Sequence, residues 1–502
     1  MFRPVLARPC IRRRCTITPP RLASRTQHTP TTRYAPPATE AIPARPPDSA
    51  FFVFLKQYLK YTLTGIVVCV ATAGTIWEGT HLLAEHVAMA PEIDSEINKW
   101  EWDVLENDWT GDPLVGGTDP SLGFWARHFV RAAWMFHYEE RTPKNIVGTA
   151  DPSKTNQEPL HRSDERLNKV ENNLRDTIQR IEASPPSSIR PHTLPTLLLR
   201  HAEVLEHFGT QSLQTAIDEY ERAWSSFTDP VHKAYIAWKL GNANSRLDRD
   251  FAAREWWSRS VQLCQSSDLG HHSAIPKSPL AQRILFSTLV SQSAHLARSG
   301  KLQEAQGLEE STLALLRSIQ SPATIASATP PESLHFLYLL QRSSLLSIHL
   351  AEVLHAQNRP TYTSVQWLTS AAESSERVAR ALTIPQLHLT DSDQLRNTEK
   401  LLPSYSSSKS MNVAASELLK DARRTAADAW NLMGILHETQ EGTKSRSALN
   451  CFEHAVRWAS TGNKNDNKAN ASPADYILES DWNIYWDNYE RVKSTLEKSD
   501  QK

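Results

Sequence analysis

Two short stretches near the C-terminal end of the chain constrain the fold more than any other feature. In the first, AWNLMGILHE, Trp430 and Gly434 are four residues apart and therefore lie on one face of a helix. In the second, ALNCFEHAV, the residues Ala448, Phe452 and Ala455 form a stripe of small, large and small side chains at helical spacing. Because glycine has no side chain, a neighbouring helix can approach closely at Gly434. We therefore predict a helix–turn–helix pair in which the Phe452 stripe packs against the face that carries Gly434.

The same arrangement of small and large side chains recurs earlier in the chain. Leu240 and Gly241 are followed by Ala253 and Trp257, with two fewer residues in the turn. Weaker copies contain Ala216, Tyr220 and Ala223, or Gly300 and Ala305, and a degenerate pair covers residues 334–357 and 365–382. Pro- and Ser-rich breaks separate the copies, and no run shows the two-residue alternation of strands. We predict an all-α fold, with four or five pairs stacked into a solenoid over residues 161–460; a helical bundle without repeats is the alternative.

This pattern resembles the tetratricopeptide repeat, W-x2-L-G-x2-Y followed by A-x3-F-x2-A. The copy that begins at Trp430 differs in having Met for Leu, His for Tyr and two extra residues in the turn. The resemblance implies that the solenoid is tetratricopeptide-like. Its repeat-packing residues are then Leu240, Gly241, Ala253, Trp257, Trp430, Gly434, Ala448, Phe452 and Ala455.

The first residues of the chain differ in composition from the rest. Residues 1–39 contain eight arginines and no acidic residue, together with many hydroxyl side chains. This composition is typical of a mitochondrial presequence, which we assign to residues 1–34; a basic tail that binds anionic surfaces is the alternative. The remainder of the chain carries 47 basic against 56 acidic residues. It therefore lacks the positive surface that nucleic acid requires.

A run of 17 uncharged residues, YTLTGIVVCVATAGTIW, follows a linker over residues 35–54. A helix needs about 20 residues to cross the hydrocarbon layer of a bilayer, so the run must draw on its flanks. Its apolar residues lie all round the helix, which favours a membrane span over the alternative, a buried core helix. We predict a transmembrane helix over residues 55–80.

The flanks of this run predict its orientation. Lys56 and Lys60 precede the apolar residues, whereas acidic residues follow them. The excess of positive charge would keep the N-terminus and the linker on the matrix side of the mitochondrial inner membrane, with the bulk of the chain in the intermembrane space. Gly65, Cys69 and Ala73 recur every four residues and form a face suited to close packing with another membrane helix. A passive anchor is the alternative.

Two aromatic segments flank the solenoid. Residues 81–160 form a Trp-rich juxtamembrane segment and linker, whose tryptophans either rest at the lipid interface or form a helical cap on the first repeat. We predict a C-terminal capping helix over residues 474–498, because a solenoid needs an element that covers its last repeat. An aromatic partner site is the alternative. The tryptophans of the first segment are Trp100, Trp102, Trp109, Trp125 and Trp134, and the aromatic face of the second is Trp482, Tyr485, Trp486 and Tyr489.

The sequence contains none of the common motifs for nucleotide binding, serine nucleophiles or zinc hydrolases. His271 and His272 lie in a Ser- and Pro-rich loop, where such a pair is more often solvated than bound to a metal. Cys264 and Cys451 are far apart in the sequence and define neither a disulfide framework nor a zinc site. We therefore predict no catalytic residue, no cofactor and no metal.

The order of presequence, single membrane helix and repeat solenoid resembles the tetratricopeptide-repeat adaptor subunit of the mitochondrial inner-membrane i-AAA protease. The resemblance rests on this layout and on the repeat residues Leu240, Gly241, Ala253, Trp430, Gly434, Ala448 and Phe452. It implies an adaptor that binds unfolded or misfolded proteins in the intermembrane space and presents them to the protease. Its partners would be the protease subunit, a second adaptor and the substrates. The alternative is an inner-membrane scaffold or assembly factor for a respiratory-chain complex.

The first helices of stacked repeats line a concave groove. In the repeat register, the groove-facing positions are Trp238, Asn242, Ser245, Arg246, Val290, Ala294, Arg298, Asn431 and Ile435. Repeat domains that clamp a C-terminal carboxylate place a Lys four residues before an Asn, whereas Trp238 stands in that position before Asn242. This difference argues against such a clamp. It favours an apolar and amide-rich groove that receives extended, unfolded segments.

Overall fold

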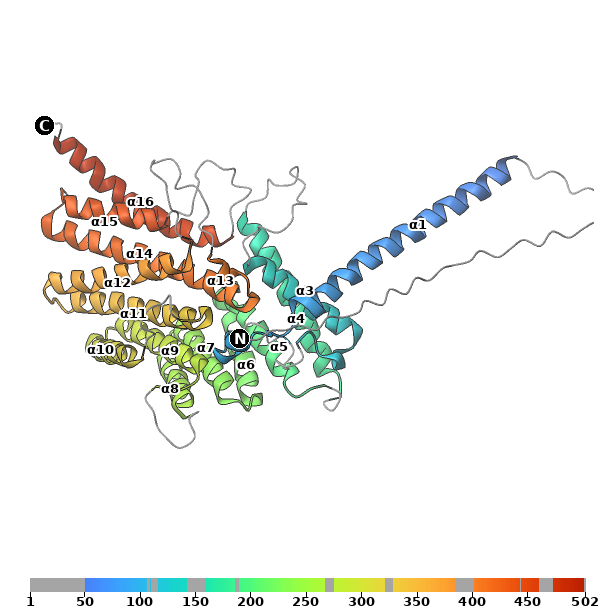
Figure 1. Cartoon of the computed structure of the whole chain (residues 1–502), viewed down its shortest axis with the longest axis horizontal. Coiled ribbons are helices and arrows are strands. Elements are labelled where there is room, and N and C mark those ends of the chain that lie inside the picture. The colour runs from blue at the N-terminus through green and yellow to red at the C-terminus, as the bar shows by residue number, and fades with distance from the viewer. Residues whose placement is uncertain are drawn as a thin grey trace, which may run out of the picture. The chain divides into compact units, whose positions relative to one another are not determined.

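Figure 1 shows the computed structural model of the chain. The chain divides into two compact units, residues 1–71 and residues 72–502, and each unit is described by itself. The predicted presequence, residues 35–49 of the predicted linker, and the loop with His271 and His272 lie outside the described residues. The structure describes residues 50–105, 109, 116–141, 159–185, 189–266, 275–320, 328–384, 401–442, 444–459 and 473–500.

The first long helix, α1 (Ala50–Leu83), contains the predicted membrane span and continues as a short π-helix, Ala84–Ala88. Among the described residues, the helical stretch Phe51–Ala88 is long and apolar enough to cross a membrane, with a mean hydropathy of 1.5 in its most apolar window. None of that window is buried, which differs from the core helix of a soluble protein. Gly65, Cys69 and Ala73 are exposed, so their packing against another membrane helix stays a prediction.

The second unit is a series of helix pairs, as the sequence predicts, and Figure 1 shows successive helices from α9 to α15 lying side by side. No strand occurs in the described part of the chain, where one isolated β-bridge joins Thr383 to Leu401. All five predicted pairs are present, and α3 with α4 adds a sixth that was not predicted. The pairs are α3 (Gly123–Arg141) with α4 (Pro159–Glu182), α5 (Thr193–Leu205) with α6 (Thr210–Ser226), α7 (Pro230–Arg246) with α8 (Asp250–Ser266), α9 (Pro279–Arg298) with α10 (Leu302–Ser318), α11 (Pro330–Ala356) with α12 (Thr361–Leu382), and α14 (Lys409–Glu441) with α15 (Arg446–Ala459).

The turns of three of the pairs share one backbone geometry, which supports the repeat. Two residues after the ends of α7, α9 and α11, the chain adopts a left-handed conformation at Asp248 (φ 55°), Gly300 (φ 74°) and Asn358 (φ 59°). Asp, Gly and Asn are the residues that adopt this conformation most readily, so the local sequence suits the turn. Helix starts are equally regular, since Asp229 and Ser278 precede a proline and accept a hydrogen bond from a backbone amide of the first turn.

The predicted packing of small against large residues is confirmed in two pairs. A Cβ atom added at Gly241 would lie 2.4 Å from the indole of Trp257, and one added at Gly434 would lie 2.6 Å from the ring of Phe452. These distances are well inside van der Waals contact, so each glycine admits an aromatic ring that no larger residue would allow. The other predicted packing residues Leu240, Ala253, Ala448 and Ala455 are fully buried.

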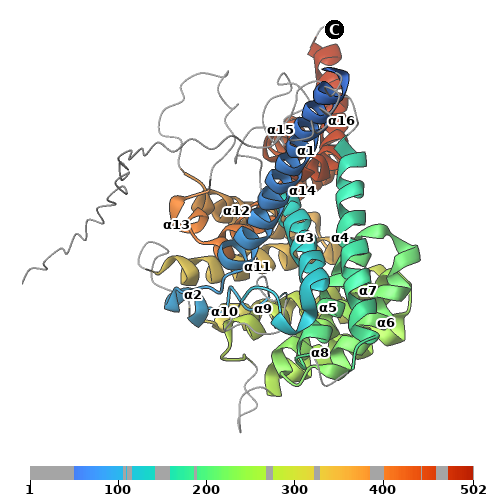
Figure 2. The same ribbon diagram turned by 90° about the vertical axis from the view of Figure 1, so that its right-hand side faces the viewer.

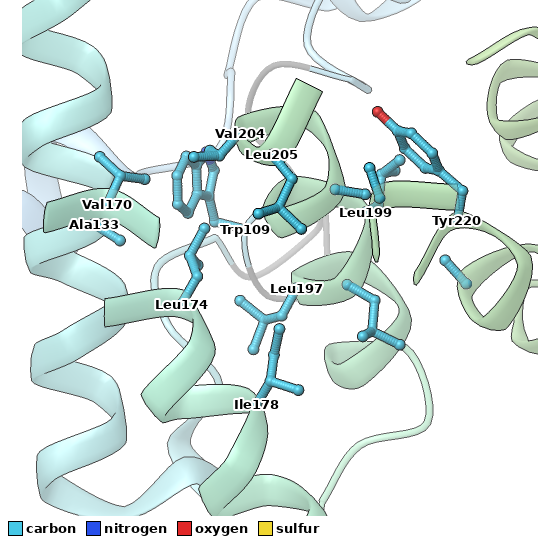
Figure 3. Packing of buried hydrophobic residues seen from close by; sticks show 14 of the residues in the cluster. Trp109, Ala133, Val170, Leu174, Ile178, Leu197, Leu199, Val204, Leu205 and Tyr220 are labelled. Carbon is cyan, nitrogen blue, oxygen red and sulfur yellow. The ribbon is translucent and has the colours of Figure 1, made fainter. Parts of the chain in front are cut away.

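The Trp-rich segment packs on the solenoid, but only Trp109 and Trp134 lie among its first helices, as the helical-cap interpretation predicts, whereas Trp100 and Trp102 contact later pairs. Trp102, Trp109 and Trp134 are buried, and Trp100 packs against the aromatic residues at the start of α11. Figure 3 shows Trp109 in a core formed with Ala133, Val170, Leu174 and Leu197 from α3, α4 and α5. Trp125 differs, because its side chain is exposed. Part of the predicted linker over 81–160 is therefore the helix α3, because its apolar face needs a partner in the core.

The last helix, α16 (Pro473–Asp500), covers the final pair, as predicted for a cap over 474–498. Tyr485 is buried against Ala427, Ala455 and Ala459, and its hydroxyl donates to Asp428 Oδ1 at 2.5 Å. Further along α16, Val492 packs on Ala448 and Phe452. The apolar stripe of α15 is thereby removed from water.

Candidate protein-binding surface

Two of the predicted groove residues, Trp238 and Asn242 on α7, form contacts within the solenoid. The Trp238 Nε1 donates to Ser291 Oγ at 3.1 Å, which joins α7 to α9. The Asn242 Oδ1 accepts a hydrogen bond from Trp257 Nε1 at 3.1 Å. Asn242 therefore satisfies the indole that fills the Gly241 notch, and its amide belongs to the packing of the pair.

Ser245 and Asn431 are buried, so the prediction that they line an open groove is wrong. The Ser245 Oγ lies 2.9 Å from His295 Nδ1 and 3.1 Å from a guanidinium nitrogen of Arg298. The Asn431 Oδ1 accepts a hydrogen bond from Asn488 Nδ2 of α16 at 2.9 Å. The Ser245 hydroxyl therefore joins α7 to α9, and the Asn431 amide joins α14 to α16. The repeat register fixes which face a residue occupies, but it does not fix how much of that face the next helix covers.

Val290 is also buried. The part of the predicted groove that stays exposed lies toward the C-terminal ends of the first helices. Arg246, Arg298 and Ile435 are exposed there. A guanidinium nitrogen of Arg246 donates to the carbonyl of Glu206 at 3.2 Å. This part of the surface offers two cationic side chains and one aliphatic side chain, in place of the amide-rich groove that the sequence predicted.

The N-terminal ends of the first helices are covered by the chain itself. We call residues 92–105, which include the short helix α2 (Ser95–Lys99), the inner segment. The carboxylate of Glu92 accepts hydrogen bonds from the hydroxyls of Ser408 and Ser410 at 3.1 and 3.2 Å, at the start of α14. Figure 2 shows α2 near α11, and Ile97 of α2 belongs to the same apolar cluster as Leu334 and Leu337 of α11.

Arg283 of α9 holds the middle of the inner segment. Its guanidinium lies 3.9 Å from the ring centroid of Trp102 and donates to the carbonyl oxygens of Trp100 and Glu101 at 3.1 and 2.7 Å. The Trp102 Nε1 donates to the carbonyl of Pro331 at 2.9 Å, at the start of α11. Burial lowers the pKa of Arg283 to about 10, so the side chain keeps its charge at neutral pH.

Glu101 ties the inner segment to the first turn of α9. Its Oε2 accepts hydrogen bonds from the Ser278 hydroxyl at 2.6 Å and from the Leu280 amide at 2.8 Å. A carboxylate at a helix N-terminus is favoured by the helix dipole and by the free amides there. Beyond it, the carbonyl of Leu105 accepts a hydrogen bond from Arg200 of α5. The inner segment thus contacts the first helices of four pairs, α5, α9, α11 and α14.

Sequence reasoning missed the inner segment. The signal available was KWEWD, in which two tryptophans flank an acidic residue close to a second acidic residue. Such a stretch has no helical stripe, yet its aromatic side chains need a surface on which to be buried. The pattern does not say which surface, because the partner residue Arg283 lies far along the chain.

Glu376 organises the last two pairs. It lines a charged depression on α12, and its Oε1 accepts hydrogen bonds from Trp430 Nε1 at 2.8 Å and from Trp458 Nε1 at 2.9 Å. Trp430, predicted as a packing residue, also stacks on His454, with 4.6 Å between the ring centroids. The depression is lined by Glu373, Glu376, Arg377, Arg380 and Ala381. Because the Glu376 carboxylate accepts hydrogen bonds from both indoles, its role is to hold the last two pairs together.

Four titratable groups in the solenoid are held uncharged at neutral pH by burial. Burial, with a smaller effect of the charge on Glu352, raises the pKa of the Glu309 carboxyl to about 8. Burial likewise lowers the pKa of His349 to about 4. The thiols of Cys264 and Cys451 have their pKa raised by burial to about 12 and about 11, so they are not thiolates at neutral pH. No group of His, Cys, Asp and Glu residues in the described ranges is placed to hold a metal ion.

Comparison with known proteins adds little to this description. No protein-family model matches the chain, and no curated protein matches it. Among solved structures, it is similar to a circular tandem repeat protein with novel repeat topology and enhanced subunit contact surfaces. The identity is 12%, the TM-score is 0.22, and the match covers 76% of this chain and 86% of that one. The repeat architecture therefore rests on the shared turns and glycine notches described above.

Proposed function

We propose that the protein is a membrane-anchored adaptor that binds unfolded or misfolded polypeptides in the intermembrane space and presents them to the i-AAA protease. The observation that carries this proposal is the series of tetratricopeptide-like pairs that follows an exposed apolar helix in the same chain. Helical-repeat solenoids present extended surfaces that bind other proteins. The Arg-rich leader supports a mitochondrial destination and the inner membrane as the site of anchorage.

The exposed ends of the first helices are the part of the solenoid that we assign to polypeptide binding. Arg246 and Arg298 can donate hydrogen bonds to the carbonyl groups of an extended chain, and Ile435 offers apolar contact. Trp238 and Asn242 are not assigned to this role, because they hold helices together. In this proposal the membrane helix keeps the surface close to a membrane-embedded protease.

The binding step is tested with the full-length chain in lipid nanodiscs and a permanently unfolded polypeptide, reduced and carboxymethylated lactalbumin. Fluorescence anisotropy should report binding that weakens in the double variant Arg246→Ala, Arg298→Ala. The control variant is Arg457→Ala, which removes an exposed arginine from the second helix of a pair, α15. An absence of binding by the unaltered chain, or equal affinity in the double variant, contradicts the proposed surface.

The alternative, a scaffold or assembly factor for a respiratory-chain complex, is favoured by one specific observation. The inner segment already occupies the N-terminal half of the surface that would otherwise receive an unfolded chain. A scaffold needs a fixed partner surface and no free groove. Affinity purification of the tagged protein from gently solubilised mitochondria separates the two functions. Recovery of an AAA protease supports the adaptor, whereas recovery of a respiratory-chain intermediate without protease supports the scaffold.

A further inference from the structure

A continuous row of aromatic rings joins the end of the apolar run to the start of α3. The ring centroids of Trp77 and His81 are 4.7 Å apart, those of His81 and His128 are 4.5 Å apart, and those of His128 and Phe124 are 4.1 Å apart. Trp125 extends the row, at 5.4 Å from Phe124. The two histidines in the middle are buried, while the aromatic residues at both ends are exposed.

Polar contacts fix the last turns of α1 on α3. The Glu78 Oε2 lies 2.8 Å from His128 Nε2, which places the first turns of α3 beside the end of the apolar run. Seven residues after Glu78, the buried carboxylate of Glu85 accepts hydrogen bonds from Arg131 at 2.5 Å and from Arg127 at 3.1 Å. Glu85 also accepts hydrogen bonds from the amide and hydroxyl of Thr118. These charge-assisted hydrogen bonds join the end of α1 and the following π-helix to the start of α3.

The ring contacts place the start of α3 near Trp77. Phe124 comes one helical turn before His128, and its ring packs on that of His128, which in turn packs on His81. Trp77 also packs on His81. Phe124 and Trp125 therefore belong to the same cluster of rings as Trp77.

Several large apolar side chains near this cluster of rings are exposed. Trp77, Phe124 and Trp125 are 60%, 60% and 64% exposed. On α1, Leu82 and Leu83 are also exposed, beyond the end of the uncharged run. Large apolar side chains gathered in this way are unfavourable in water, and Trp at the end of a membrane span is typical of the bilayer interface.

We infer that Phe124 and Trp125 form a second membrane contact, seated in the headgroup layer of the same bilayer that α1 crosses. This inference rests on the membrane anchorage in the proposed function and adds a contact made by the solenoid itself. Two contacts, one through α1 and one through α3, restrict the angle at which the solenoid meets the membrane. The hydrogen bonds of Glu78 and Glu85 hold the start of α3 beside the end of the apolar run.

The test places the photoreactive amino acid p-benzoylphenylalanine at single positions of the full-length chain in nanodiscs of phosphatidylcholine and phosphatidylethanolamine. Position 125 probes the inferred contact, and position 124 repeats it at the neighbouring residue. Position 68 lies in the apolar run and reports the membrane span. Position 251 is the matched control, because Phe251 is an aromatic side chain that is 77% exposed on α8. Lipid adducts are counted by mass spectrometry after irradiation.

We expect lipid adducts at positions 68, 124 and 125, and several-fold fewer at position 251. Adducts at 68 without adducts at 124 and 125 overturn the inference and leave the membrane anchor intact. A lack of adducts at 68 overturns the anchorage in the proposed function and the inference with it. Equal adducts at 125 and 251 also overturn the inference, because the contact would then not be specific to the start of α3.

Discussion

The guanidinium of Arg283 stacks on the indole of Trp102 at 3.9 Å, and this pair fastens the inner segment to the first helix of the fourth pair. The cation is buried and its donors are directed at two carbonyl oxygens of the segment. A buried guanidinium is stable only when its donors are satisfied, so the segment and α9 depend on each other. The surface that sequence analysis assigned to a partner is in this way partly filled by the chain itself.

Replacing this arginine should release the inner segment. In Arg283→Ala, we expect the free energy of local opening to fall by about 2–4 kcal/mol, the range for a buried charge that donates several hydrogen bonds. Hydrogen–deuterium exchange should be faster in residues 95–105 and in the first turn of α9, and unchanged in α15. Arg283→Lys should restore little, because an ammonium group cannot reproduce the planar fork. Unchanged exchange in the segment would show that Trp102 holds it without the arginine.

Release of the inner segment separates the two candidate functions. If the solenoid binds unfolded polypeptides, Trp102→Ala should raise its affinity for carboxymethylated lactalbumin, because the N-terminal half of the groove becomes available. Fluorescence anisotropy on the full-length chain in nanodiscs measures this change, with Arg457→Ala as the control. A scaffold should show no gain in affinity. Instead, it should lose its partner complex in affinity purification.

The glycine notches give a prediction about stability. Gly241→Ala and Gly434→Ala should each destabilise the solenoid by about 1–3 kcal/mol, because the new Cβ overlaps the ring of Trp257 or Phe452. The control is Gly307→Ala in α10, where an added Cβ meets no atom within 4 Å. That change should stabilise the protein by about 0.5–1 kcal/mol, as alanine is the better helix former. Thermal unfolding followed by circular dichroism compares the three variants, and similar melting temperatures for all of them would refute the notch interpretation.

The sequence predicts these notches because their cause is local. A small residue on the first helix and an aromatic residue on the second recur at a nearly fixed spacing, which short turns preserve. Gly434 with Phe452 and Gly241 with Trp257 could be read in this way, and the structure confirms both. The left-handed turn residues Asp248 and Asn358 are equally local, but neither is a glycine, so they carry a weaker signal.

The candidate binding surface could be predicted only in part, because its exposure depends on contacts between distant segments. Asn431 occupies a groove position in the repeat register, yet Asn488 of α16 covers it. A tryptophan such as Trp102 suits a lipid interface as well as a protein core. Its contacts with Arg283 and Pro331 show that it lies in the core. Periodicity places a residue on a helix face. It does not identify which distant segment will cover that face.

The raised pKa of Glu309 gives a prediction of how the stability of the solenoid depends on pH. Its carboxyl group is fully buried, and burial raises its pKa from 4.5 to about 8. The folded chain therefore keeps a proton that the unfolded chain releases, so this group lowers the stability progressively as pH rises from about 4.5 to about 8. Glu309→Gln retains the shape of the neutral acid and removes the titration. We expect this variant to melt at nearly the same temperature as the parent at pH 5 and at a clearly higher temperature at pH 8. Glu304→Gln, an exposed change on the same helix, should show no such divergence, and a constant difference across this range would exclude Glu309 as the source.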